Sequence, residues 1–314
     1  MSLLRGGTCR WTAALALTLL LSGCGTLSPA LRPGDGLPQQ AYAGAPFFAQ
    51  EIHHCGPSAL AGALGASGVT TTPDALAPQV YLPGREGSLQ LELVAAARGA
   101  GRIAYVLDPA LEDALREVAA GRPVLVLQNL GLSWYPRWHY ALLVGYDLEA
   151  RSVTLHSGTE RDYVTALATF DRTWARAGRW ALVIPAPGTL PATARELPYI
   201  AAAAALERSD PVAAEAAYDT ALVRWPASLP ARLGLGNARY ARGDLAGAEA
   251  AFSAAARAHP DAAVAHNNHA HVLARLGRRA EAQAAARRAV ELAGDSLPEA
   301  RRTLDEIKGL GARD

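Results

Sequence analysis

The sequence predicts an α+β domain followed by an all-α domain. The chain has 314 residues, a length that fits two domains. In its middle part, segments with helical spacing come first and short apolar runs follow, which is the order of an α+β fold rather than of alternating β-α-β units. In the last third alanine dominates, and similar residues recur every 34 positions. That change in composition marks the boundary between the two domains.

The N-terminus has the features of a secretory signal. Arg5 and Arg10 flank its start, and Thr12 to Leu21 is a short apolar stretch. A helix of this length cannot cross the roughly 30 Å core of a bilayer, so we expect the segment to be removed rather than to act as an anchor.

This stretch ends in Leu21-Ser22-Gly23-Cys24, which resembles the lipobox of bacterial lipoproteins. The resemblance implies that residues 1–23 are cleaved as a signal peptide and that Cys24 carries lipid, with acyl chains such as palmitate. Gly25 follows where that family uses aspartate for inner-membrane retention. The resemblance therefore implies an outer-membrane location, with the protein facing the periplasm.

Three cysteines are present, and two of them are accounted for by this processing. Cys9 leaves with the signal and Cys24 is modified by lipid, so Cys55 is the one remaining thiol in an oxidising compartment. Residues 24–45 are rich in glycine and proline and are interpreted as a flexible tether.

Cys55 lies in a sequence context that favours a reactive thiol. Gly56-Pro57 and the small and apolar residues after it predict a helix start, because proline is tolerated in the first helical turn. The positive end of the helix dipole is expected to lower the pKa of a cysteine placed there. Gln50 can offer a side-chain N–H to an oxyanion.

The remaining elements of the middle segment, residues 46–186, follow from spacing and breakers. Helices are predicted over 58–66, 89–99 and 111–120, the last two ending at a glycine. Apolar runs typical of strands follow at 123–128, 139–145, 152–156 and 180–184.

The base for the thiol is expected to be a histidine. His139 begins a predicted strand after Trp134-Tyr135-Pro136-Arg137-Trp138, whose rings are expected to exclude water from it. The alternative is that His139 is a half-buried strand residue. His53 and His54 adjoin Cys55 in sequence, but neighbouring side chains usually point elsewhere, so they are expected to line the approach.

The Gln50…Cys55-Gly-Pro box and the later Trp138-His139-Tyr-Ala-Leu-Leu-Val-Gly-Tyr-Asp segment together resemble the double-glycine leader peptidases, which are papain-like cysteine peptidases. The resemblance covers about residues 46–160. It implies a papain-like fold, with Cys55 as nucleophile, His139 as general base and acid, and Gln50 as oxyanion donor.

Two positions depart from the family pattern. Gln50 lies five residues before Cys55 where the family has six, and Ser157 occupies the place of the family's aspartate on the strand after the histidine. A hydroxyl can fix the imidazole tautomer but cannot stabilise an imidazolium as a carboxylate does. Asp147 and Asp162 are alternatives for that role, or residues of solvated turns. We therefore expect a Cys–His dyad with a weak third member.

The 34-residue period relates Pro226 to Pro260, Asp210 to Asp244 and Tyr218 to Phe252. This period and the small–aromatic–small spacing resemble tetratricopeptide repeats. After a linker at 187–194, three copies are expected in residues 195–296, and 297–314 are expected to form a capping helix and tail.

A repeat array presents a concave surface, so binding of a protein partner or peptide is expected. Asn267 and Asn268 are candidates to hold an extended backbone, or are polar helix positions. His266, His269 and His271 lack the geometry of a metal site, and no metal or cofactor is predicted. The net charge of +1 gives no indication of nucleic-acid binding.

These features together predict a membrane-anchored cysteine peptidase whose repeats recruit the peptide or protein substrate, or a partner. Two alternatives stay open. One is an inactive peptidase fold that serves as a binding scaffold for envelope proteins, and the other is a hydrolase of cell-wall peptides.

Overall fold

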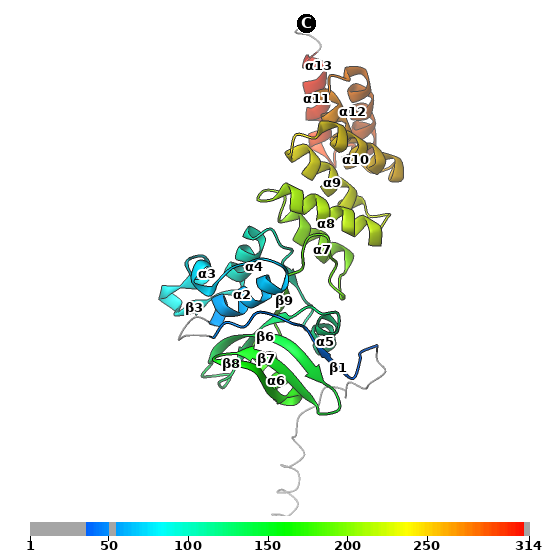
Figure 1. Ribbon diagram of the computed structural model, residues 1–314. Helices are drawn as coiled ribbons and strands as arrows, with labels where there is room; N and C mark the ends of the chain where they lie inside the picture. The colour runs from blue at the N-terminus through cyan, green and yellow to red at the C-terminus, as the bar shows by residue number, and fades with distance from the viewer. Residues whose placement is uncertain (1–35, 50–54, 311–314) are drawn as a thin grey trace, which may run out of the picture.

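Two parts follow each other along the chain in the computed structural model, which describes residues 36–49 and 55–310 (Figure 1). A domain of mixed sheet and helices is followed by a stack of helices that extends away from it. The predicted order, an α+β domain and then an all-α domain, is confirmed.

The first part contains a sheet of seven antiparallel strands in the order β4-β9-β5-β6-β7-β8, with β1 also paired to β6. Its strands are β1 (Gln40–Tyr42), β4 (Tyr105–Val106), β5 (Val124–Asn129), β6 (Trp138–Asp147), β7 (Ser152–Ser157), β8 (Glu160–Ala166) and β9 (Ala181–Val183). A separate hairpin pairs β2 (Tyr81–Leu82) with β3 (Gly87–Ser88), and a short 3-10 turn, η1 (Pro83–Arg85), joins them.

Helices cover both faces of this sheet. They are α2 (Cys55–Ala66), α3 (Pro73–Val80), α4 (Gln90–Gly99), α5 (Leu111–Ala119) and α6 (Leu167–Ala175). Strand alternation decides which side chain faces which layer. Leu125 and Leu127 of β5 pack with α2, α3 and α4, whereas Val124 and Val126 pack with α5 and α6.

Some elements were not predicted from the sequence. The flexible tether predicted over 24–45 is wrong in its last part, because Gln40–Tyr42 form β1 on the sheet and Leu37 and Ala43 are buried in the core. Strand β8 is exposed along its length at the edge of the sheet, so it lacks the apolar run that marks the buried strands. Helix α6 follows it directly and its N-cap, Ala166, makes no side-chain capping bond. Helix α3 does carry a start signal, because Thr72 Oγ1 accepts from Ala75 N–H at 3.3 Å and Pro73 follows.

The segment 43–49 packs against α2 close to where the helix meets β6. A Cβ at Gly65 would lie 2.6 Å from Pro46 Cγ, and one at Gly62 would lie 2.9 Å from the Pro46 carbonyl oxygen and 3.1 Å from Leu142. Small residues along α2 therefore permit this close packing, and the helix is buried from Gly56 to Leu64.

The second part is a series of helical hairpins. Its helices are α7 (Glu196–Ala204), α8 (Pro211–Arg224), α9 (Leu229–Ala241), α10 (Leu245–Ala258), α11 (Ala263–Arg275), α12 (Arg279–Ala293) and α13 (Pro298–Leu310). Each packs on its neighbours in the chain, as Figure 1 shows.

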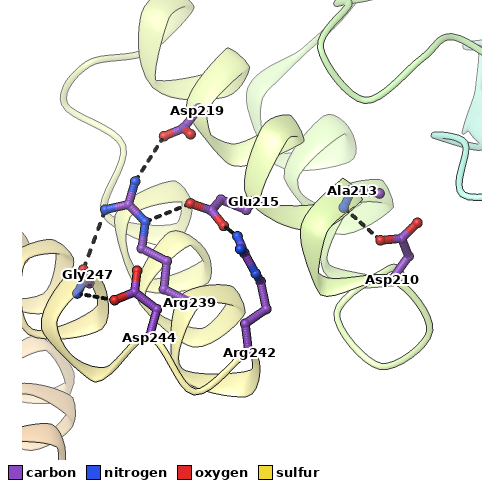
Figure 2. A network of polar contacts seen from close by, with 8 residues as sticks. All are labelled: Asp210, Ala213, Glu215, Asp219, Arg239, Arg242, Asp244 and Gly247. Atoms are coloured by element: carbon purple, nitrogen blue, oxygen red, sulfur yellow. Dashed lines mark hydrogen bonds and ion pairs between the residues drawn. The ribbon is translucent and has the colours of Figure 1, made fainter.

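Residues 34 positions apart make equivalent contacts in this stack. Asp210 Oδ1 accepts from Ala213 N–H at 2.9 Å, and Asp244 Oδ1 accepts from Gly247 N–H at 2.8 Å, so each aspartate caps the second helix of a hairpin (Figure 2). Residues one sequence repeat apart thus cap equivalent helices, in addition to packing at equivalent places.

Ionic contacts join α8 to α9 on the surface of the stack (Figure 2). Arg239 Nε donates to Glu215 Oε1 at 3.0 Å, and Arg242 pairs with the other carboxylate oxygen. Asp219 lies 3.9 Å from Arg239. One carboxylate shared by two guanidinium groups fixes the angle between neighbouring helices.

Two glycines of α9 let aromatic rings approach its backbone. A Cβ at Gly234 would lie 2.2 Å from the Tyr218 ring, and one at Gly236 would lie 2.4 Å from the Phe252 ring. Tyr218 and Phe252 are buried. The glycines and the rings are therefore parts of one packing motif.

Gly236→Ala is expected to lower the free energy of unfolding of the helical stack by about 2 kcal/mol, because the new methyl group must displace the buried Phe252 ring. Gly309→Ala in α13 is the matched control, since a Cβ there meets nothing within 4 Å. Thermal unfolding monitored by circular dichroism checks the difference. Equal midpoints for the two variants would contradict this packing argument.

The two parts share one apolar core. Tyr199 and Leu206 from the start of the stack pack with Tyr105 and Leu115 of the first part. The intervening segment is held by hydrogen bonds at two points: Tyr105 Oη bonds to the Thr193 carbonyl and to Arg195 N–H, and Tyr199 Oη donates to the Pro187 carbonyl.

Glu117 is the polar centre of this junction. It is fully buried, and its carboxylate accepts from Arg122 at 2.6 Å and from the backbone N–H and the hydroxyl of Thr193 at 2.8 and 2.7 Å. The segment between the two parts is thus fixed to α5.

Across the described ranges, no helix combines the length and the apolar character that a membrane crossing requires.

Candidate active site

Cys55 is the first residue of α2 and is partly buried. Its thiol faces backbone N–H groups, those of Gly56 in its own helix and of Tyr140 in β6. The contact with Tyr140, the residue that follows His139, places the thiol near the beginning of β6. The predicted helix start at this cysteine is observed.

Position 56 requires glycine because Ser88 of β3 packs against the first turn of α2. A Cβ at this position would be 2.4 Å from Ser88 Oγ and 2.7 Å from Ser88 Cβ. Strand β3 thereby approaches the helix N-terminus beside the thiol. The Tyr140 hydroxyl donates to the Ser88 carbonyl at 3.3 Å and ties β3 to β6.

A cavity of about 960 Å³ opens at Cys55. Its walls come from the β2–β3 hairpin, the start of α4 and the start of β6. The lining includes Cys55, Ser88, Leu127, Pro136, Arg137, Trp138 and Tyr140. The cavity is a cleft with Cys55 in its lining, where the charged residues Arg85, Glu86 and Arg137 stand beside apolar ones such as Leu127 and Pro136.

His139 lies between two of these lining residues, Trp138 and Tyr140, near the start of β6. Its ring turns toward β7, where Nε2 lies 2.8 Å from Ser157 Oγ. The structure therefore joins His139 and Ser157 directly, and it places the Cys55 thiol at the backbone of the next residue of β6.

Neither aspartate considered for the third position contacts His139. Asp162 accepts from the Tyr42 hydroxyl at 2.7 Å and bonds to His156 Nε2 at 3.2 Å. Asp147, at the far end of β6, accepts from Ala150 N–H at 2.8 Å in the turn that follows. The hydroxyl of Ser157 is the group that meets the imidazole.

Burial is the largest influence on the pKa of the Cys55 thiol and on the pKa of the His139 ring. It raises the pKa of the Cys55 thiol above its ordinary value, although the N–H groups of Tyr140 and Gly56 act in the opposite direction. The expected lowering by the helix start is therefore wrong for the free protein, because desolvation outweighs the backbone donors. Burial also lowers the pKa of His139, so the ring is neutral at pH 7.

The aromatic residues before His139 do not shield it as expected. Trp134, Tyr135 and Trp138 are exposed, because residues 130–137 extend past the end of the sheet as a continuation of the β5–β6 hairpin. Trp134 and Tyr135 belong to that extension, whereas Trp138 adjoins His139 in β6 and lines the cleft.

Residues 42–182 match the model of the Peptidase_C39 like family, and residues 205–267 match the tetratricopeptide repeat model. The chain joins a C39-like peptidase domain to tetratricopeptide repeats. The predicted resemblance to both families is confirmed.

Two solved structures are similar to parts of the chain. One, described as a putative C39-like peptidase from Bacillus anthracis, is 19% identical, with a TM-score of 0.39 over 46% of this chain and 96% of its own. The other, a tetratricopeptide repeat protein from Thermus thermophilus, is 27% identical with a TM-score of 0.31. It covers 34% of this chain, and the chain spans 63% of its length. Comparison with curated proteins gave no match.

Some predicted site residues lie outside the described residues. These are Gln50, the expected oxyanion donor, the neighbouring His53 and His54, and the expected lipid attachment site Cys24. Their roles stay predictions.

In the repeats, Asn267 is buried and its amide nitrogen lies 3.5 Å from Asn268 Oδ1, while Asn268 is partly exposed. Of the two, Asn268 is the better placed to meet a partner. The nearby histidines bond elsewhere: His266 Nε2 to the Pro260 carbonyl and His269 Nε2 to Glu249. The described residues contain no cluster of His, Cys, Asp or Glu suited to a metal ion.

Two residues of the cleft lining, Ser88 and Tyr140, were not predicted from the sequence. Tyr140 follows the histidine on a buried strand, and its apolar neighbours gave no indication of a role at the thiol. Ser88 is brought to Cys55 by packing of β3 against α2, and nothing in its local sequence predicts that contact.

Proposed function

We propose that this chain is a cysteine peptidase that hydrolyses a peptide bond in the cleft at Cys55. The observation that carries the proposal is the arrangement at the start of β6, where His139 bonds to Ser157 through Nε2 at 2.8 Å and the next residue, Tyr140, directs its N–H to the thiol. A nucleophile, a base and a group that orients the base are the parts that such chemistry needs.

In this mechanism the proton moves from the thiol to the base once substrate is bound. The free thiol is protonated, because burial raises its pKa, and the neutral His139 is able to accept its proton. Since Nε2 is engaged by Ser157, Nδ1 is the nitrogen that takes the proton from Sγ. The sulfur then attacks the carbonyl carbon, and the imidazolium returns the proton to the leaving amine.

The acyl group on sulfur is released by water, from which His139 removes a proton. The Tyr140 and Gly56 N–H groups already face the sulfur and support negative charge on it as the proton leaves. Gln50 is assigned to the oxyanion by the family pattern.

The remaining parts of the chain bring the substrate to the cleft. The repeats recruit the substrate or a partner, and because the junction at Glu117 holds them rigidly they present it at a fixed distance from the cleft. The enzyme is tethered by lipid on the periplasmic side of the outer membrane, a location supported by the lipobox at Cys24 and the glycine- and proline-rich segment after it.

Labelling of Cys55 with iodoacetamide across a pH series tests the dyad. At neutral pH we expect His139→Ala to slow labelling at least about tenfold, because the thiol then lacks its base. The acid limb of the wild-type profile should fall below about pH 6.5, the ordinary pKa of histidine, since the pKa of His139 is lowered and the neutral ring is the active form. Ser157→Ala should give a smaller loss, because the ring keeps its base but not its fixed tautomer.

Peptide mapping by mass spectrometry assigns the label to Cys55 in the mature chain. Identical labelling profiles for the wild type and His139→Ala would mean that no dyad operates. The inactive scaffold, which the serine at position 157 favours, would then be the correct interpretation.

A further inference from the structure

The β5–β6 hairpin ends in a tip that exposes large apolar side chains. We call residues 130–138 the aromatic hairpin. Five of its side chains have exposed fractions between 50% and 80%: Leu130, Leu132, Trp134, Tyr135 and Trp138. Water contact with so much apolar surface is unfavourable, so a concentration of this kind marks a binding surface.

The aromatic hairpin is an ordered structure. Leu132 and Tyr135 pair across the turn, with N–H to O distances of 3.1 and 3.2 Å. Asn129 Oδ1 accepts from the N–H groups of Gly131 and Arg137 at 2.9 Å, and Arg176 donates to the Asn129 carbonyl. The exposed rings are therefore held in place before any partner arrives.

Pairing places several of these side chains on one face. Leu130 N–H bonds to the Arg137 carbonyl and Leu132 pairs with Tyr135, so Leu130, Leu132 and Tyr135 share a face by strand alternation. The returning leg, Pro136 to Trp138, forms a wall of the cleft that contains Cys55. By the same alternation Pro136 and Trp138 lie on the opposite face from Leu130, Leu132 and Tyr135. The hairpin therefore borders the cleft with one face and carries apolar side chains on both faces.

The position of the chain's N-terminal segment argues for a polypeptide on this surface rather than a membrane. Strand β1 pairs with β6 at Gly145 to Asp147, whereas the aromatic hairpin leaves β6 at Trp138. The length of strand β6 separates these ends, about 30 Å at the usual rise. Strand β1, the first described strand after the expected lipid site at Cys24, therefore joins the sheet at the end opposite to the hairpin.

We propose that the aromatic hairpin binds an extended, apolar segment of the polypeptide substrate, next to the segment that occupies the cleft. This inference rests on the proposed peptidase function, which supplies the substrate. Rigid aromatic side chains lose little conformational freedom on binding and commonly provide much of the affinity of an interface. The hairpin would select substrates with apolar side chains beside the scissile bond.

Binding is tested with the full mature chain carrying Cys55→Ala, so that the peptide stays intact. The probe is a fluorescent synthetic peptide with leucine and phenylalanine at alternate positions, compared with one that has serine and glutamine there. Fluorescence anisotropy gives Kd. We expect Trp134→Ser with Tyr135→Ser to weaken binding of the apolar peptide about tenfold. Both side chains are largely exposed, so the fold should be unaffected.

Val223→Ser on α8 is the matched control, an apolar side chain 87% exposed and distant in the chain, and it should leave Kd unchanged. The proposal is overturned if the apolar peptide binds no better than the polar one, or if the double variant binds it as tightly as its parent. It is also overturned if the double variant loses only binding to vesicles of phosphatidylethanolamine and phosphatidylglycerol. Because Kd is measured without catalysis, a failure of the peptidase proposal leaves this readout interpretable.

Discussion

Cys55→Ala is expected to abolish peptide hydrolysis, with a loss of at least about 10³-fold in turnover, because Cys55 carries the one thiol among the described residues that line the cleft and the hydroxyl of Ser88 is a far weaker nucleophile. The substitution removes one sulfur atom at a partly buried position, so the fold and the cleft should persist. The assay follows new amino termini by mass spectrometry after incubation with an unfolded polypeptide such as reduced casein.

Two controls separate chemistry from folding in this experiment. Cys9→Ala changes a cysteine in the predicted signal and should leave turnover unchanged, while the unfolding midpoint of Cys55→Ala should match that of the wild type. New termini produced at the wild-type rate by Cys55→Ala would refute the assignment of the nucleophile. Stem fragments released from purified sacculi by the wild type alone would instead identify cell-wall peptides as the substrate.

Glu117→Ala is expected to lower the free energy of unfolding by about 3–5 kcal/mol, the largest stability loss we foresee. The change leaves the Arg122 guanidinium and two donors of Thr193 without their acceptor in a buried site. Because the same carboxylate fixes the segment between the two parts, the repeats should also lose their fixed position relative to the cleft.

Denaturant unfolding of the full chain measures this loss. Glu112→Ala is the matched control, an exposed acidic residue on the same helix, and it should change the free energy by less than about 1 kcal/mol. Glu117→Gln should fall between them, since an amide oxygen can still accept from Thr193 but carries no charge for Arg122. Equal effects of Glu117→Ala and Glu112→Ala would contradict the role of the junction.

The rigid junction also bears on how the repeats could act. A shared core that runs from Leu115 to Tyr199 leaves little room for the two parts to rotate independently. A substrate bound to the repeats would therefore have to be long enough to extend to the cleft, because the two parts do not move together to bring it there. Under the proposed function, the residues that stabilise the junction also set the position from which the repeats deliver substrate.

Features with a local physical cause could be predicted from the sequence. The strands β5, β6, β7 and β9 follow from apolar runs, and the helix at Cys55 follows from Gly56-Pro57. The period between Asp210 and Asp244 follows from a repeated capping requirement. The edge strand β8 and helix α6 could not be predicted in the same way, because neither an apolar run nor a capping side chain marks them.

Some features of the candidate site could likewise be predicted from the sequence, and others depend on the fold. Residue types and spacing were enough to select Cys55 and His139 as candidates, and the resemblance to the leader peptidases added Ser157. The direction of the thiol pKa was not predictable, because it depends on how much water burial removes and on the N–H of Tyr140, a residue far away in sequence. The contact of Ser88 with Gly56 likewise exists only once β3 packs on α2.

The order of the two folds and the choice of candidate nucleophile and base therefore follow from local pattern and residue chemistry, which are present in the sequence. Three other features appear only in the folded chain: Ser157 rather than Asp162 meets the imidazole, Glu117 fixes the repeats to the first domain, and the rings before His139 face solvent. Each of these depends on strand register and on packing between distant segments, and a one-residue change of register would reverse which side chains meet.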